Sequence, residues 1–96
     1  MNNTCEATMK LLGDYWTLRI IGSLDSGSKR FCELQRDIDN VSPVTLTSRL
    51  KKLEDHNLVA RDEKDKASVI YSLTSMGTRA VPVIDALSNF EAHASA

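Results

Sequence analysis

The alternation of apolar and polar residues predicts helices over the first part of the chain. Thr4 is a favourable N-cap for a short first helix that ends at Gly13, and Asp14 is placed to cap a second helix over residues 15–24. The second helix has too many apolar residues to be exposed, so we expect it at the centre of the core. A brief strand at residues 29–31 and a third helix over residues 32–38 follow.

The clearest helix start in the chain is Ser42-Pro43, because serine is a favoured N-cap and proline is favoured at the first helical position. This helix is expected to run to about His56. At about 100° per residue, one narrow stripe of it collects Leu46, Leu50 and Leu53, and the opposite face is small and polar. The helix therefore has one face for the core and one for solvent or a partner.

Two β-type runs, residues 58–61 and 68–73, flank a polar stretch at residues 62–67. This arrangement predicts a hairpin with a charged tip. Asn57 is expected to end the preceding helix in the left-handed conformation, a position that glycine fills more often.

The last helix is expected to begin after Thr74, which is a suitable cap. Its apolar residues are more numerous than one small core needs, so part of the helix is expected to face a partner. Pro82 removes a helical hydrogen bond and predicts a kink or a restart near Ala80.

These elements predict an α+β, mainly α fold: a winged helix-turn-helix domain with a small antiparallel β-hairpin wing and terminal dimerisation helices. Residues 1–96 are expected to form this single domain, since 96 residues with 42% hydrophobic and 26% charged positions have the composition of one globular unit. The net charge of -1 is not the basic footprint of many nucleic-acid binders, so an interaction with DNA must rest on local charge.

Other function classes find little support in the sequence. No apolar run approaches a signal peptide or the roughly 20 residues of a membrane span, so we expect a cytoplasmic protein with no membrane partner. Cys5 and Cys32 lack the spacing of a zinc or redox site, so no metal and no cofactor is implied. The chain has no paired carboxylates, nucleophile-base set or phosphate-binding glycine loop, which makes an enzyme the least expected case.

A short helix, a tight turn and a longer helix with small polar residues at its start are typical of a helix-turn-helix, in which the second helix enters the major groove. Small residues let that helix approach the base edges, and hydroxyl groups can bond to bases and phosphates. The predicted DNA-contacting residues of this helix are Ser42, Pro43, Val44, Thr45, Thr47, Ser48, Lys51 and Lys52.

Basic residues elsewhere extend the predicted DNA surface. Arg49 can add a phosphate contact, and Lys29 with Arg30 offers a second basic pair. Lys64 and Lys66 lie at the predicted hairpin tip. Acidic residues alternate with them, so the wing is nearly neutral and should make few contacts.

Each of these features also has an interpretation without DNA. A Lys-Lys pair before Glu54-Asp55 is usually a solvated helix face, and a charged hairpin tip is usually a soluble turn. Only the adjacency of the two favours DNA contact. Trp16 is assigned to core packing, and Cys5 and Cys32 are by default small buried or half-buried residues.

Linked motifs run through nearly the whole chain in order. They are Cys5-Glu6-Ala7, Gly13-Asp14-Tyr15-Trp16-Thr17-Leu18, Arg30-Phe31-x-Glu33-Leu34, Leu46-Thr47-x-Arg49-Leu50, Leu53-Glu54, Leu58-Val59 and Tyr71-Ser72-Leu73-Thr74. This set resembles HxlR-type winged-helix regulators, which have MarR-like relatives, and is far more specific than a helix-turn-helix pattern alone.

The resemblance implies a homodimeric bacterial or archaeal transcription factor. Its N- and C-terminal helices would form the dimer interface, and its two recognition helices would read a pseudo-palindromic operator in double-stranded DNA. Some members sense oxidants or electrophiles through a cysteine at the position of Cys5. Two departures, Glu6 in place of a frequent proline and a wing that looks short, count against redox sensing and strong wing contact respectively.

The leading hypothesis is therefore a DNA-binding transcriptional regulator, and the sequence does not indicate whether it has a small-molecule effector. The alternative from another class is a winged-helix protein-interaction module without DNA binding, which the mildly acidic charge would suit. Such a module would leave the basic residues of the recognition helix unused.

Overall fold

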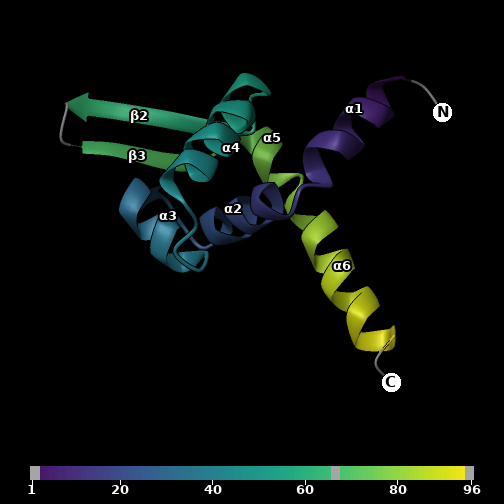
Figure 1. Cartoon of the computed structure of the whole chain (residues 1–96). Helices are drawn as coiled ribbons and strands as arrows, with labels where there is room; N and C mark the ends of the chain where they lie inside the picture. Colours follow the sequence, from purple (N-terminus) through teal and green to yellow (C-terminus); the bar gives the residue numbers. More distant parts are fainter. Residues whose placement is uncertain (1–2, 66–67, 95–96) are drawn as a thin grey trace.

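The computed structural model describes the backbone of residues 3–65 and 68–94 and the side chains of residues 6–65 and 68–91. Figure 1 shows a body of helices and a small sheet from which the two terminal helices project. In chain order, the elements are α1 (Asn3–Leu12), α2 (Tyr15–Asp25), β1 (Lys29–Arg30), α3 (Phe31–Asp37), α4 (Pro43–Asp55), β2 (Val59–Asp65), β3 (Ser68–Leu73), α5 (Ser75–Thr78) and α6 (Val81–Ala94). The predicted fold class, mainly helical with a winged helix-turn-helix, is confirmed.

The core forms around α2, as predicted. Asp14 caps this helix, and its side chain accepts a hydrogen bond from the Thr17 backbone amide at 3.0 Å. The apolar side of α2 packs against α3, α4 and the sheet, where side chains exposed by 4% or less include Ile20, Ile21, Leu24, Leu34, Ile38, Leu46, Leu50 and Leu53. Trp16 is half-buried against this cluster, which confirms its packing role.

The predicted start of α4 is also confirmed. The Ser42 hydroxyl accepts a hydrogen bond from the Thr45 amide at 3.1 Å. Pro43 occupies the first turn, where its missing amide hydrogen costs no helical hydrogen bond. Asn57 follows the helix with φ 66°, the left-handed conformation that the sequence predicted.

Asp39 and Asn40, in the turn between α3 and α4, have φ values of 63° and 54°. Aspartate and asparagine tolerate this left-handed conformation better than most residues, so the pair permits a tight turn between the two helices.

The sheet has three antiparallel strands in the order β1-β3-β2. The brief strand expected near Lys29 pairs with Tyr71 of β3, so the hairpin gains a third strand. The prediction of a turn over residues 62–67 is wrong for its first part, because β2 continues to Asp65 with an irregularity between Glu63 and Asp65. Pairing with the apolar strand β3 outweighs the weak strand preference of these charged residues.

The C-terminal region contains two helices rather than one. Thr74 caps α5 by accepting from the Gly77 amide at 3.0 Å, and α6 restarts at Val81 with Pro82 in its first turn. The predicted restart near Ala80 is therefore confirmed. A Cβ atom on Gly77 would lie 2.0 Å from the Leu58 carbonyl oxygen, so α5 can pack this closely only with glycine there.

The two terminal helices, α1 and α6, project from the body of the molecule (Figure 1). Helix α1 begins at Asn3, so Thr4 lies inside it and is not its cap. Helices α1 and α6 leave the body in different directions (Figure 1). None of the helices in the described ranges is long and apolar enough to cross a membrane.

Candidate nucleic-acid interface

The outer face of α4 presents the residues that the sequence predicted for DNA contact. Ser42 and Pro43 are exposed at its start, and Val44 is 80% exposed. Thr45 is half-buried, and its Oγ1 accepts a hydrogen bond from the Ser42 hydroxyl at 3.2 Å. The remaining exposed members of this face are Thr47, Ser48, Lys51 and Lys52.

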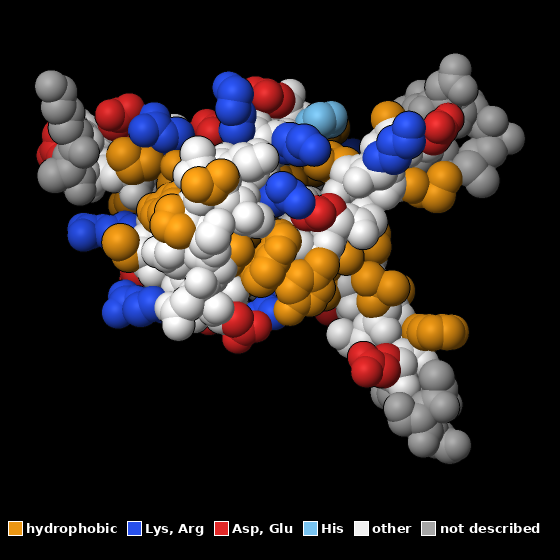
Figure 2. All heavy atoms as spheres, in the orientation of Figure 1, with side chains coloured by type: hydrophobic (Ala, Val, Ile, Leu, Met, Phe, Trp, Pro, Cys, Tyr) orange, Lys and Arg blue, Asp and Glu red, His pale blue; other side chains and the backbone are white. Residues whose placement is uncertain are grey.

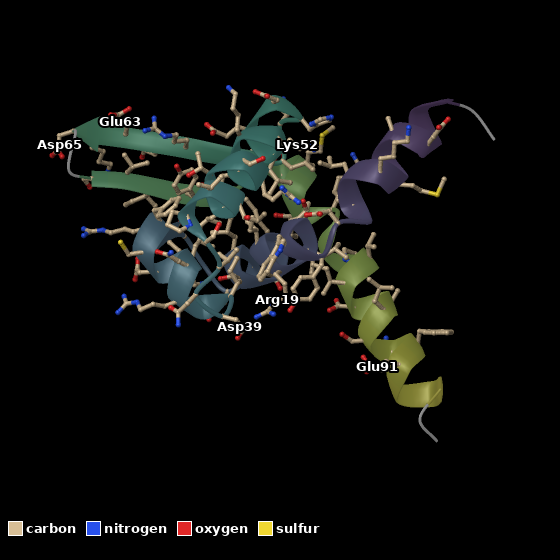
Figure 3. All side chains as sticks on the ribbon, viewed as in Figure 1. Arg19, Asp39, Lys52, Glu63, Asp65 and Glu91 are labelled. Atoms are coloured by element: carbon tan, nitrogen blue, oxygen red, sulfur yellow. The ribbon has the colours of Figure 1, made fainter. Side chains whose placement is uncertain are left out.

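Lys51 and Lys52 form no ion pair with another residue of the described ranges, although Glu54 and Asp55 follow them directly. Figure 3 shows Lys52 on α4, and Figure 2 shows Lys and Arg side chains spread over the same face of the molecule. Both ammonium groups are therefore free to meet phosphate oxygens.

Arg49 has a different environment. Its Nε donates to Asp14 Oδ2 at 2.8 Å and its Nη2 donates to Asp14 Oδ1 at 3.2 Å. The hydrogen bonds from Arg49, aided by those from Thr17, lower the pKa of Asp14 from 3.8 to about 2 despite partial burial. The sequence predicted a phosphate contact for Arg49, but its guanidinium instead donates two hydrogen bonds to Asp14.

The two residues of the second basic pair, Lys29 and Arg30, also differ in whether their side chains are bonded within the protein. The half-buried Lys29 donates from Nζ to the Ser23 carbonyl oxygen at 2.5 Å and to the Ser26 hydroxyl at 2.7 Å. These hydrogen bonds place its charge at the C-terminal end of α2. Arg30 is exposed, and its side chain has no ion pair among the residues described. Of the two predicted cations, only Arg30 remains available beside α3.

Arg19 was missed by the sequence reasoning and holds the turn of the helix-turn-helix in place. Its Nη1 donates to Asp39 Oδ2 at 3.0 Å and to the Tyr15 hydroxyl at 2.5 Å. The labelled Arg19 and Asp39 lie together below α2 in Figure 3. A cation within an otherwise apolar core helix was the available signal, because such a charge needs a partner.

The wing carries mixed charge. Arg61 pairs with Glu63 at 2.8 Å, while Lys64 is exposed and has no ion pair among the described side chains. Figure 3 places Glu63 and Asp65 towards the outer end of the hairpin. Lys66 lies outside the described residues. The acidic groups oppose close approach to phosphate, so the wing is a weaker candidate contact than α4.

Exposed apolar side chains gather on the terminal helices. Met9 on α1 is 54% exposed, and Val83, Leu87 and Phe90 on α6 are 40%, 50% and 72% exposed. Apolar side chains are also visible on the projecting α6 in Figure 2. Contiguous exposed apolar side chains of this size are typical of interaction surfaces.

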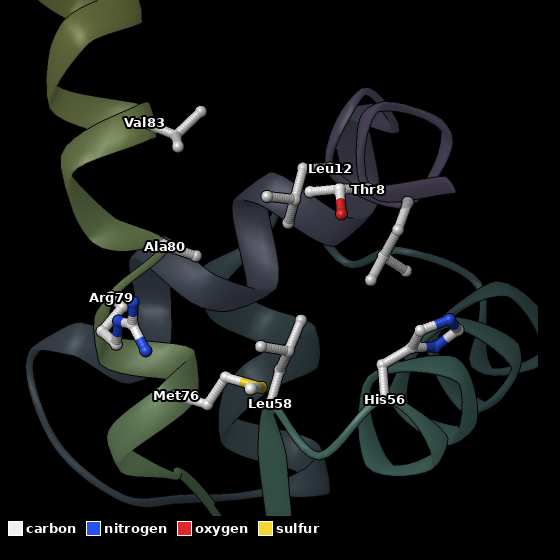
Figure 4. Close-up of a pocket in the computed structure, with 9 residues that line it drawn as sticks. Thr8, Leu12, His56, Leu58, Met76, Arg79, Ala80 and Val83 are labelled. Carbon is white, nitrogen blue, oxygen red and sulfur yellow. The ribbon is translucent and has the colours of Figure 1, made fainter. Parts of the chain in front are cut away.

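Two grooves accompany this surface. One, of about 470 Å³, lies between α1, the segment that joins α4 to β2, and the α5–α6 region, and another of about 420 Å³ lies between α1 and α6. Figure 4 shows Thr8 and Leu12 on one side of the larger groove and Leu58 and Met76 on another. The residues around the larger groove are Thr8, Leu11, Leu12, His56, Leu58, Met76, Arg79, Ala80 and Val83.

The structure tests the expectation of a buried or half-buried thiol for one of the two cysteines. Cys32 is exposed on α3, so the prediction of a buried or half-buried thiol is wrong for it, because the buried face of that short helix is occupied by Leu34. The backbone of Cys5 lies in α1, and its side chain is outside the described part of the structure. Among the described side chains, His, Cys, Asp and Glu form no cluster that could hold a metal ion.

A helix-turn-helix with hydroxyls and unpaired lysines on its second helix, next to a three-stranded sheet, defines the class of winged helix-turn-helix regulators. The model of the family described as HxlR-like helix-turn-helix matches residues 11–95. The chain therefore belongs to the HxlR-like helix-turn-helix family.

Individual relatives agree with this assignment. The HTH-type transcriptional regulator YodB of Bacillus subtilis is 40% identical over 75 residues, which cover 76% of this chain and 67% of YodB. YvaP of the same organism, also an HTH-type transcriptional regulator, is 32% identical over 87 residues, covering 88% of this chain and 81% of YvaP. These relatives are transcriptional regulators and not enzymes.

Solved structures give the same result. The reduced form of YodB matches with a TM-score of 0.83 and 35% identity over 94% of this chain and 90% of YodB. The oxidised form of the redox regulator HypR matches with a TM-score of 0.81 and 27% identity over 91% of this chain and 92% of HypR. Redox-responsive regulators are thus among the structural relatives.

Proposed function

We propose that the chain is a sequence-specific DNA-binding transcriptional regulator that acts in the cytoplasm as a homodimer on a pseudo-palindromic operator. The whole chain would serve as one winged helix-turn-helix domain, with α4 in the major groove. The observation that carries this proposal is the outer face of α4, where hydroxyl groups and two unpaired lysines lie opposite a fully buried leucine stripe.

Each residue of this face has a role that its chemistry suits. Thr47 and Ser48 would bond to base edges or phosphates, and Val44 would contact a thymine methyl group. Lys51 and Lys52 would neutralise phosphates of the backbone. Ser42, Pro43 and Thr45 would bring the first turn of α4 close to the DNA, while Arg30 and Lys64 would make peripheral contacts.

The homodimer is supported by the exposed apolar side chains of α1 and α6. Two operator half-sites one helical turn apart require two recognition helices in a fixed relation, which a symmetric dimer supplies. A second copy covering Met9, Leu87 and Phe90 would remove that apolar surface from water.

A selection experiment with DNA tests the proposal. The wild-type chain is used to enrich duplexes from a random pool, and binding of the enriched duplex is then measured over a KCl series. Replacing Lys51 and Lys52 by alanine should weaken binding and reduce the slope of log K against log [KCl] by roughly 0.9 for each phosphate that the variant no longer neutralises. Circular dichroism should show an unchanged fold.

Lys10→Ala is the matched control, because Lys10 is an exposed cation on α1 that pairs with Glu6 at 3.5 Å. It should leave the salt slope unchanged. If the lysine pair on α4 has the same slope as the wild type, α4 does not contact phosphate. If no duplex is enriched and none binds at low salt, the alternative function as a winged-helix protein-interaction module is favoured instead.

A response to oxidants through Cys5 is the finer part of the proposal. Its support is that YodB structures exist in reduced, diamide-treated and quinone-bound forms. DNA affinity should change after diamide treatment in the wild type and in Cys32→Ser but not in Cys5→Ser. An identical response in all three proteins would remove Cys5 from the mechanism.

A further inference from the structure

Asp14 is bound by groups from two distant parts of the chain. Its Oδ2 accepts hydrogen bonds from the Thr17 amide and the Thr17 hydroxyl, both at 3.0 Å. The same carboxylate accepts the two bonds from Arg49, which lies 35 residues further along on α4. One side chain thus caps α2 and ties it to the helix proposed to enter the DNA groove.

The geometry of the contact restricts how α4 can rotate. Two donors of a planar guanidinium meet the two oxygens of one carboxylate, and such a fork fixes orientation as well as distance. The side chains are only 28% and 29% exposed, so water competes less for this pair than for a surface ion pair. A lysine at this position has the charge but not the fork.

The pair also lies at the junction with α1. Gly13 is the residue between α1 and Asp14, and its amide donates to the Met9 carbonyl oxygen at 2.8 Å. A Cβ atom on Gly13 would lie 2.6 Å from that oxygen, so the end of α1 and the cap of α2 are closely joined. The anchor of α4 is therefore one residue away from a terminal helix.

We propose that Arg49 is a positioning residue for DNA recognition, which does not touch DNA but holds α4 at a fixed angle to the α1–α2 junction through Asp14. This inference rests on the function proposed above. It assigns two neighbouring cations of α4 opposite tasks: Lys52 faces the phosphates, and Arg49 orients the helix that carries it. It also gives the terminal helices a direct route by which their arrangement influences α4.

The salt dependence of DNA binding separates positioning from phosphate contact. The enriched duplex is titrated with the wild type, Arg49→Gln and Arg49→Lys over a KCl series. Both variants should bind about tenfold more weakly at every salt concentration, with the slope of log K against log [KCl] unchanged. Arg49→Lys is the sharper variant, because it keeps the charge and removes only the fork.

A double-mutant cycle identifies the partner. Asp14→Asn can still cap α2 but has lost the charge that binds Arg49, so it should reproduce the loss. The combination with Arg49→Gln should be no weaker than either single variant, since both remove the same interaction. Ile20→Val, a fully buried position on α2, controls for general loss of stability and should leave affinity unchanged.

Every outcome decides the inference. Wild-type affinity in Arg49→Gln overturns it. A flattened salt slope also overturns it, because it would make Arg49 a phosphate contact. Full rescue by Arg49→Lys overturns it as well, because a positive charge without the fork would then be sufficient. Additive losses in the double variant would exclude Asp14 as the partner. Failure of the wild type to bind any duplex is a separate result that contradicts the proposed function itself.

Discussion

Helices α4 and α6 have almost the same length, 13 and 14 residues, but they arrange their apolar residues in opposite ways. The leucines of α4 are 2% exposed or less, and its outer face is polar apart from Val44. On α6, Leu87 and Phe90 are 50% and 72% exposed. The difference is that α4 packs its leucines within its own chain, whereas the outer part of α6 leaves large apolar side chains exposed to solvent.

The attachment of the two helices to the body shows the same contrast. Helix α4 is fixed by a serine cap, a buried leucine stripe and the Asp14–Arg49 ion pair. Helix α6 touches the core through Val81 and Ile84 near its start, and Ile84 lies beside Gly22 of α2. Changes in α4 should therefore alter the free energy of unfolding, and changes in the outer part of α6 should alter association.

The largest expected effect is on the leucine stripe. Leu46→Ala should lower the free energy of unfolding by about 2–5 kcal/mol, because it removes buried methyl groups and leaves a cavity. Urea denaturation measures the change. Val44→Ala on the same helix removes an 80% exposed side chain and should change stability by less than about 0.5 kcal/mol. Equal losses in both variants would contradict the assignment of faces.

The ion pair of α4 predicts a specific dependence on pH. Asp14 has a pKa lowered from 3.8 to about 2, so its charged form is favoured in the folded state and stabilises it above pH 4. This contribution, about 2 kcal/mol, is lost as the pH falls through 4 to 2. Stability measured against pH should fall less steeply over that range in Asp14→Asn, and parallel curves for the two proteins would contradict the assignment.

The cap of α4 should have a smaller effect. Ser42→Ala removes the acceptor of the Thr45 amide and should cost about 1 kcal/mol of unfolding free energy. Ser48→Ala, an exposed serine on the same helix, is the matched control and should be nearly neutral. Thermal denaturation of the two variants side by side tests whether position, and not serine itself, matters.

The sequence predicted those parts of the fold that depend on nearby residues. The caps Asp14, Ser42 and Thr74 act on amides three residues away, and Asn57 adopts the left-handed conformation by itself, so short motifs are sufficient to recognise them. The leucine stripe of α4 was likewise visible as a repeat along one helix. The predicted outer face of α4 followed from the same repeat.

Features that depend on distant residues were not predictable in the same way. The partner of Arg49 lies 35 residues earlier, so charge patterning along α4 suggested a phosphate contact instead. Lys29 was assigned to DNA for the same reason, although it closes the end of α2. The strand from Asp62 to Asp65 forms because β3 is its neighbour, and the charged sequence alone indicated a turn.

Substitutions at the exposed apolar residues of α6 should have the smallest effect on the unfolding free energy of the protomer. They test the comparison of α4 with α6 most directly. If a second copy covers them, association stabilises only the folded state, and the Tm of the wild type should rise with protein concentration. Replacing Leu87 and Phe90 by serine should abolish that rise, while the unfolding free energy at the lowest concentration stays within about 0.5 kcal/mol of the wild type.

Val44→Ser makes the same kind of change on α4 and should keep the concentration dependence. Sedimentation equilibrium should then show monomers only for the α6 variant, whereas a dimer in that variant would mean that α6 is not the surface on which two copies meet.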